Sequence, residues 1–142
     1  MQVRDLMSTA VVTVPADATL EAVADRLLDA EVGSVVVVDS DGNPMGIVTE
    51  SDVLRAARDT GRPLADIAIS EVTHRPVVTT TPSRAISTVA RQMTDEGVKK
   101  VPVLDGIDLV GIVTMTDIVW ELPALWQEAG EIRALRDEWS PN

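Results

Sequence analysis

The sequence predicts an α+β fold built from two copies of one strand–helix–strand–strand–helix unit, followed by a C-terminal helix. Val11-Val12-Thr13 recurs 66 residues later as Val77-Val78-Thr79, and Gly46-Ile47-Val48-Thr49 recurs 65 residues later as Gly111-Ile112-Val113-Thr114. Within each copy, apolar residues follow first a helical spacing and then a continuous strand-like run. In-register matches with a single gap indicate a tandem repeat.

The length and composition fit one globular body. The chain has 142 residues, of which 45% are hydrophobic and 25% charged, and these values exclude wholesale disorder. A unit of roughly 60 residues buries too little apolar surface to be stable alone. We therefore expect the repeats to pack together, related by a pseudo-twofold axis between their sheets. The predicted division is 1–60 for the first repeat, 61–122 for the second with its linker, and 123–142 for the C-terminal helix.

Each repeat opens with an extended segment and a helix. The extended segments are predicted at 11–14 and 77–80. Asp17 and Ser83, residue types that favour helix N-caps, then precede apolar residues at helical spacing. They predict the start of the first helix in each repeat.

Two strands and a second helix complete each repeat. Continuous apolar runs indicate strands covered on both faces, and the turn residues after them predict hairpins. The predicted strands are 35–38 and 45–48 in the first repeat, and 101–104 and 109–113 in the second. Thr49 and Thr114 then open the second helices.

The residues after the repeats predict an amphipathic helix. It is expected to begin after Pro123 and to end before Pro141. Its apolar positions follow helical spacing and are Leu125, Ala129, Ile132, Leu135 and Trp139. The apolar face either packs on its own repeats or contacts a second copy of the chain.

Two copies of a Val-Thr segment, a helix, a Val-rich strand ending in Asp and a Gly-Ile-Val-Thr-x-x-Asp motif resemble a tandem pair of cystathionine-β-synthase-type (CBS) domains, often called a Bateman module. The resemblance covers about residues 1–120. It implies that adenosine-type ligands, such as AMP, ADP, ATP or S-adenosylmethionine, bind in clefts between the repeats and that the signal passes to a partner. Because the chain shows no fused partner domain, it resembles the stand-alone members.

The Thr-x-x-Asp motif suits a ribose phosphate. The Asp52 carboxylate can accept hydrogen bonds from both hydroxyls of a ribose, and Thr49 and Ser51 place hydroxyls at a helix N-terminus, where a phosphate is favoured. The same spacing is also a capping arrangement that needs no ligand. The two interpretations are compatible, because the threonine can cap while the aspartate binds.

The resemblance implies two clefts with unequal chemistry. The first would be formed by Ile47, Thr49, Ser51, Asp52, Val78, Lys99 and Lys100. The second would be formed by Val12, Gly33, Ser34, Ile112, Thr114, Thr116 and Asp117. In the family, basic residues at the positions of Lys99 and Lys100 contact nucleotide phosphates. They are the chain's two lysines, although most lysines are solvated surface charges. His74 and Arg75 could add positive charge or lie on plain surface.

Several classes of function are disfavoured. A net charge of −11, from 23 acidic and 12 basic residues, argues against nucleic-acid binding. The longest run of large apolar residues, Val35–Val38, is too short to span a membrane, and the N-terminus lacks a secretory signal, so we expect a cytoplasmic protein. With no cysteine, one histidine and no Gly-rich phosphate loop, we expect no catalysis, metal or cofactor.

The sequence therefore predicts a non-catalytic regulatory module that binds an adenine nucleotide and signals to an unidentified effector protein. A ligand-free structural or adaptor dimer is one alternative, and an S-adenosylmethionine sensor is another. The two lysines favour phosphate over sulfonium, since a cationic ligand would be repelled. We also expect a homodimer formed through the second helices of the repeats and the C-terminal helix.

Overall fold

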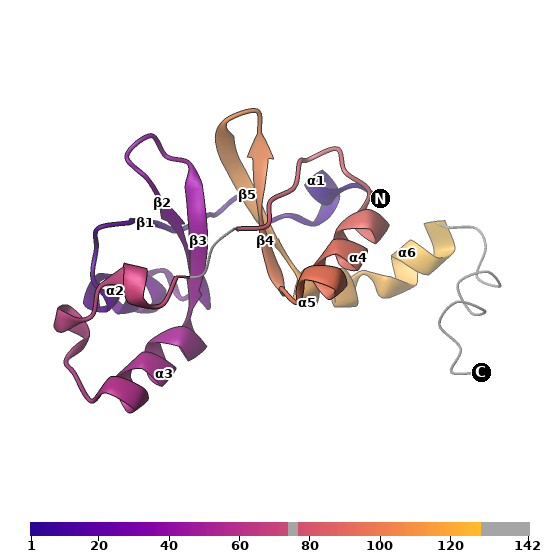
Figure 1. The fold of residues 1–142 in the computed structure, drawn as a ribbon. Helices are drawn as coiled ribbons and strands as arrows, with labels where there is room; N and C mark the ends of the chain where they lie inside the picture. Colours follow the sequence, from indigo (N-terminus) through magenta and orange to yellow (C-terminus); the bar gives the residue numbers. More distant parts are fainter. Residues whose placement is uncertain (74–76, 129–142) are drawn as a thin grey trace.

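The computed structural model describes residues 1–73 and 77–128 (Figure 1). The first repeat contains β1 (Thr13–Pro15), α2 (Leu20–Ala30), β2 (Ser34–Val38), β3 (Pro44–Thr49) and α3 (Glu50–Thr60). The second contains α4 (Ile86–Glu96), β4 (Lys100–Asp105), β5 (Asp108–Thr114) and α5 (Met115–Trp120). The remaining helices are α1 (Val3–Leu6), the 3-10 turns η1 (Leu64–Asp66) and η2 (Ile69–Glu71), and α6 (Leu122–Glu128). The predicted α+β fold of two similar units is confirmed.

The sheets of the two repeats differ because of one proline. In the first sheet β1 runs parallel to β2 and β2 antiparallel to β3, and the Val36 N–H donates to the Val12 carbonyl at 2.9 Å. In the second sheet β4 pairs antiparallel with β5, and Pro102 occupies the position that matches Val36. Proline has no N–H to donate to Val78. The extended segment 77–80 therefore pairs with β4 through an isolated bridge and forms no strand.

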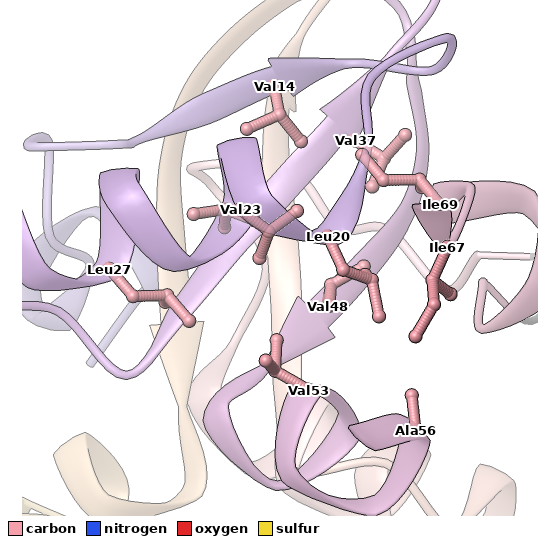
Figure 2. Close-up of a cluster of buried hydrophobic side chains, with 11 residues drawn as sticks. Val14, Leu20, Val23, Leu27, Val37, Val48, Val53, Ala56, Ile67 and Ile69 are labelled. Carbon is pink, nitrogen blue, oxygen red and sulfur yellow. The ribbon is translucent and has the colours of Figure 1, made fainter. Parts of the chain in front are cut away.

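Each hydrophobic core is completed by a segment that precedes the other repeat. The first core, built on α2, α3 and the first sheet, includes Ile67 and Ile69 of the segment between the repeats (Figure 2). The second core, built on α4, α5 and the second sheet, includes Val3 from the N-terminal segment. All three side chains are at most 1% exposed. The repeats are thus interlocked.

The first helix of each repeat begins later than predicted. Asp17 and Ser83 are not the N-caps; Thr19 caps α2 and Ala85 precedes α4. The Thr19 hydroxyl accepts from the helix at 3.5 Å, whereas Ala85 makes no side-chain cap.

The exchanged segments explain these starting points. The Leu20 N–H at the start of α2 donates to the Ile67 carbonyl at 2.9 Å, and the Ile86 N–H at the start of α4 donates to the Met1 carbonyl at 3.0 Å. The first N–H groups of a helix have no partner within it. Here backbone carbonyls from distant segments satisfy one of them, so a side-chain cap is not required at α4.

Gly111 on β5 is required by the close approach of the N-terminal segment. A Cβ at this position would lie 2.8 Å from Met7 Sδ and 2.9 Å from the Ser8 carbonyl oxygen. Ser8 and Ile112 exchange two backbone hydrogen bonds of 2.9 Å each. The segment therefore pairs with the edge of β5.

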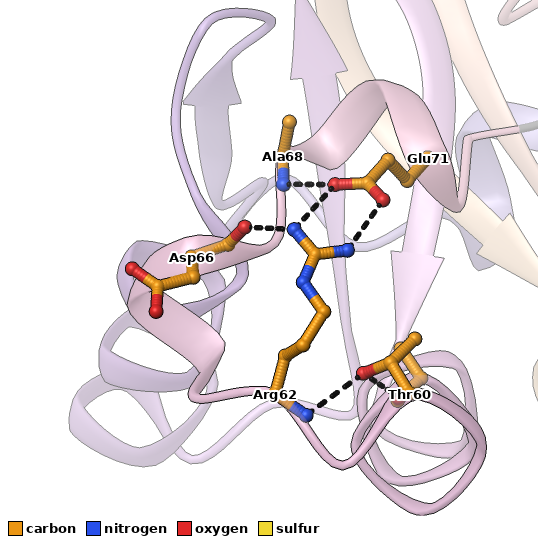
Figure 3. Close-up of polar contacts among 6 residues, drawn as sticks. Thr60, Arg62, Asp66, Ala68 and Glu71 are labelled. Carbon is orange, nitrogen blue, oxygen red and sulfur yellow. Dashed lines mark hydrogen bonds and ion pairs between the residues drawn. The ribbon is translucent and has the colours of Figure 1, made fainter.

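Arg62 stabilises the segment that connects the two repeats, residues 61–72, through hydrogen bonds (Figure 3). Its guanidinium donates to the Glu71 carboxylate at 2.8 Å and to the Asp66 carbonyl oxygen. The Ala68 N–H donates to the same carboxylate at 2.9 Å. The hydrogen bond from Arg62, followed by that from Ala68, lowers the pKa of Glu71. These contacts position the segment that completes the first core.

The C-terminal helix begins earlier than predicted. α6 starts at Leu122, directly after α5, and Pro123 lies in its first turn rather than before it. Proline is tolerated there because the first N–H groups have no helical partner. The following predicted residues lie outside the described part of the chain: His74, Arg75, Ala129, Ile132, Leu135 and Trp139.

Thr80→Val should stabilise the protein. Thr80 is 4% exposed, and its hydroxyl has no hydrogen-bond partner, whereas the matching residue of the first repeat is the buried Val14. Because an unpaired buried hydroxyl is unfavourable, we expect the free energy of unfolding to rise by about 1 kcal/mol in urea titrations. Thr80→Ser keeps the hydroxyl and should destabilise. A destabilised valine variant would show that the hydroxyl is satisfied.

Val3→Ala should loosen the second core although residue 3 precedes the first repeat. The lost methyl groups should cost about 2 kcal/mol. Amide hydrogen exchange should show lower protection in β4 and β5 for this variant, and lower protection in β2 and β3 for Ile67→Ala. The opposite assignment would contradict the exchange of segments.

Glu71→Gln should destabilise the connection in a pH-dependent way. Since the folded pKa lies below the ordinary value of 4.5, the carboxylate stabilises the fold above that pH and loses this effect as the pH falls. Thermal melts should give a lower Tm for the variant at pH 7 and a smaller difference at pH 3. The pair is solvent-exposed, so the effect is small. A difference that is equal at both pH values would contradict this role.

Candidate functional site

A cavity of about 700 Å³ lies between the two repeats. The first repeat contributes Gly33, Ile47, Thr49, Glu50, Ser51, Asp52 and Arg55. The second contributes Val77, Val78, Gly97, Val98, Lys99 and Lys100. Figure 1 shows the two repeats side by side. The lining residues lie on β3, at the start of β4, in α3, in the extended segment 77–80 and in the segments that precede β2 and β4. Every residue expected in the first cleft lies on this one cavity.

In each repeat, a backbone hydrogen bond joins the residue that precedes the first strand of the hairpin to the start of the second helix. The Glu50 N–H at the start of α3 donates to the Gly33 carbonyl at 3.1 Å, and the Met115 N–H at the start of α5 donates to the Lys99 carbonyl at 2.7 Å. Each bond joins the residue before a strand to the first turn of the helix in the same repeat. The bond to the Lys99 carbonyl therefore fixes the backbone that carries the two lysines on the cavity wall.

Gly33 lies on the wall of the first cavity, although the family pattern assigned it to the second cleft. A Cβ on Gly33 would lie 3.5 Å from the Lys100 ammonium nitrogen, so this lysine reaches across to the first repeat. Lys100 is half-buried and Lys99 is exposed.

Both Thr-x-x-Asp motifs form capping boxes. Thr49 Oγ1 accepts from the Asp52 N–H at 3.2 Å, and Asp52 Oδ2 accepts from the Thr49 N–H at 2.9 Å. Thr114 and Asp117 make the same pair of bonds at 3.1 Å and 3.0 Å. The capping interpretation is confirmed. The box uses one carboxylate oxygen, Oδ2, in each repeat.

Arg55 is a wall residue that the sequence analysis missed. Its Nη1 lies 3.3 Å from Asp52 Oδ1, one helical turn away on α3. The spacing of three residues on a helix was the signal that could have found it. The matching position of the second repeat is Trp120, which is 79% exposed.

The cavity concentrates positive charge. Arg55, Lys99 and Lys100 lie on its wall together with the carboxylates of Glu50 and Asp52. Three cations against two anions leave an excess of positive charge in a chain whose net charge is −11. This site therefore favours an anionic group more than the remainder of the acidic chain does.

Apart from Gly33, the residues predicted for the second cleft do not line this cavity. Ser34 opens β2, Ile112 and Thr114 lie on β5, and Thr116 and Asp117 lie in the first turn of α5. Val12 precedes β1, and its carbonyl is already bonded within the first sheet. The edge of β5 at Ile112 is covered by the N-terminal segment. Neither lysine belongs to this set.

Two further properties concern residues 1–73 and 77–128. Their His, Cys, Asp and Glu side chains include no group of three that could hold a metal ion. None of the helices in these ranges has the length and apolar character needed to cross a bilayer.

The CBS domain model matches residues 3–59 and again residues 69–124. The chain belongs to the CBS domain family. The predicted tandem pair is confirmed, since the two matched ranges correspond to the two repeats.

Curated proteins from other organisms are similar over most of the chain. "Uncharacterized protein MJ1225" from Methanocaldococcus jannaschii is 29% identical over 137 residues, which cover 94% of this chain and 48% of that protein. "Hypoxic response protein 1" from Mycobacterium tuberculosis is 27% identical over 120 residues and 84% of each chain. The chain spans 48%, 57% and 31% of three curated relatives, about half their length or less.

Solved CBS structures have the same fold. The CBS domain pair of protein MJ0100, in complex with 5′-methylthioadenosine and S-adenosyl-L-methionine, has a TM-score of 0.77 and 26% identity, and the match covers 87% of this chain and 97% of that one. Hypoxic Response Protein I, solved with two coordinated zinc ions, has a TM-score of 0.74 and 26% identity over 87% of this chain and 100% of that one.

Proposed function

We propose that the chain is a non-catalytic regulatory module that binds an adenine nucleotide, AMP, ADP or ATP, between its repeats and signals to an effector protein. The observation that carries this proposal is the cavity in which Arg55, Lys99 and Lys100 lie near Asp52. Membership of the CBS family supports a ligand-binding regulatory role. The MJ0100 domain pair supports an adenosine-based ligand, because both of its bound molecules contain adenosine.

The wall offers a partner for each part of a nucleotide. Asp52 suits the ribose hydroxyls, and Lys99 and Lys100 suit the phosphates. Ile47 and Val78 supply the apolar surface for the adenine. Since Pro102 cannot donate to the Val78 carbonyl, that carbonyl is available to the exocyclic amine of the base.

A second candidate is S-adenosylmethionine in the second cleft. There Trp120 replaces Arg55, and the lysines are on the other site. The sulfonium is a cation, which a carboxylate such as Asp117 and an aromatic face both attract. The MJ0100 pair, which was solved with 5′-methylthioadenosine and S-adenosyl-L-methionine, supports this candidate.

Adenine nucleotides should raise the Tm of the protein in a thermal-shift panel. A ligand at 100 times its Kd adds about 2.7 kcal/mol to the free energy of unfolding. Asp52→Asn should weaken AMP binding by about tenfold or more, whereas the matched variant Asp117→Asn should leave it unchanged. Both variants retain an oxygen for the capping box. No shift with AMP, ADP or ATP would contradict the proposed function, and equal losses in both variants would contradict the assignment to the first cleft.

We also propose a homodimer formed through α3 and α5, with the C-terminal helix reinforcing it. Leu54 on α3 is 71% exposed, and Val119 on α5 is 53% exposed. Leu54 and Val119 occupy matching positions of the two repeats. Apolar side chains at equivalent places on both second helices are suited to a self-complementary contact.

The double substitution Leu54→Glu and Val119→Glu should convert the dimer to a monomer, because it places charges in an apolar contact. Light scattering at high salt, where repulsion between acidic protomers is screened, measures the mass. Leu28→Glu on α2, where Leu28 is 76% exposed, is the matched control and should remain dimeric. A wild-type monomer at micromolar concentration would contradict the proposal.

A further inference from the structure

The Asp52 carboxylate has a donor on each of its oxygens. Oδ2 accepts from the Thr49 N–H at 2.9 Å, and Oδ1 lies 3.3 Å from Arg55 Nη1. In the second repeat Asp117 Oδ2 makes the same capping bond, but the residue one turn later is Trp120. The guanidinium on the carboxylate is therefore a feature of the first cleft.

A ribose that binds Asp52 competes with Arg55 for Oδ1. Because Oδ2 already accepts the cap bond, Oδ1, the oxygen that faces Arg55, is the less occupied acceptor for the diol. The side chain of Arg55 is 59% exposed, against 21% for Asp52, so the arginine is the partner that can move. An exposed ion pair of this kind is weak and can be broken by a ligand.

The displaced guanidinium remains on the wall of the same cavity. Lys99 and Lys100 lie on the opposite repeat, so an anion between them and α3 lies where Arg55 can reach it. Arginine presents a planar fork of donors that matches a phosphate in two parallel hydrogen bonds. A ligand with both a diol and a phosphate breaks the ion pair between Arg55 and Asp52 but offers Arg55 the phosphate as a new partner. A ligand with a diol and no phosphate breaks the same pair and leaves Arg55 unpaired.

We propose that Arg55 is the specificity-determining residue of the first cleft, and that it makes this cleft select phosphorylated over unphosphorylated adenosine ligands by exchanging Asp52 for the phosphate. The inference rests on the proposed nucleotide site and adds a selection rule that the two lysines alone do not provide. Fixed cations attract a phosphate, but only Arg55 is engaged with the ribose-binding carboxylate before the ligand arrives.

Calorimetric titration with AMP and with adenosine tests the selection. Arg55→Gln should weaken AMP binding by about tenfold and leave adenosine binding unchanged or slightly tighter, so that the preference for AMP falls by about the same factor. Arg58→Gln is the matched control: Arg58 lies on the same helix, pairs with Asp59 at 2.8 Å and is not on the cavity wall. It should retain the wild-type preference.

Two results would overturn the selection rule. Equal weakening of AMP and adenosine in Arg55→Gln would show a general structural effect, and wild-type affinity for both ligands would show that Arg55 does not contact the phosphate. In both cases wild-type AMP binding would stand, and the proposed function with it. Failure of the wild-type protein to bind either ligand would instead reject the nucleotide site itself.

Discussion

The crossed attachment of the segments 1–8 and 64–72 is the constraint on which the rest of the structure depends. Each segment precedes one repeat and completes the core of the other, through Val3 in one direction and Ile67 and Ile69 in the other. The same segments bond to the first helices at their starts. A repeat of this size buries too little surface to be stable by itself. The exchanged segments supply the additional buried apolar surface and keep the two repeats next to each other.

That arrangement creates a cavity shared by the two repeats. Small sequence differences make the two repeats chemically unequal. Pro102 in place of Val36 prevents a third strand in the second sheet, and Arg55 stands where the other repeat has Trp120. The two lysines stand where the first repeat has a glycine and a serine. The two copies of the duplicated unit thus differ in charge, and Arg55, Lys99 and Lys100 lie together on the wall of one cavity.

The sequence predicted the parts of the fold that depend on local patterns. The duplication, the apolar strands and the capping boxes could all be identified from short segments. The helix starts at Leu20 and Ile86 could not be identified in this way. They depend on hydrogen bonds to backbone carbonyls far away in the sequence, and no local residue type indicates such a bond. The missing strand at 77–80 depends on the register that places Pro102 opposite that segment.

In the candidate site, too, residues in local motifs could be predicted and residues that depend on side-chain contacts could not. Residues with a recognisable motif, such as Asp52 and the paired lysines, were predicted to share a cleft, and the structure places them on the wall of one cavity. Arg55 was missed because its importance comes from an ion pair with a motif residue. Gly33 was assigned to the other cleft because its role depends on where the Lys100 side chain ends. The sequence of one repeat does not show which residues of the other repeat its side chains contact.

Amide NMR spectra recorded during a titration with AMP test the central claim most directly, because they locate the ligand on both repeats at once. The account predicts saturable shifts at Gly33, at 49–52 and at 97–100, with the corresponding turn at 114–117 little affected. Shifts confined to one repeat, or equal shifts at both Thr-x-x-Asp turns, would contradict a single anion-binding cavity shared by the interlocked repeats.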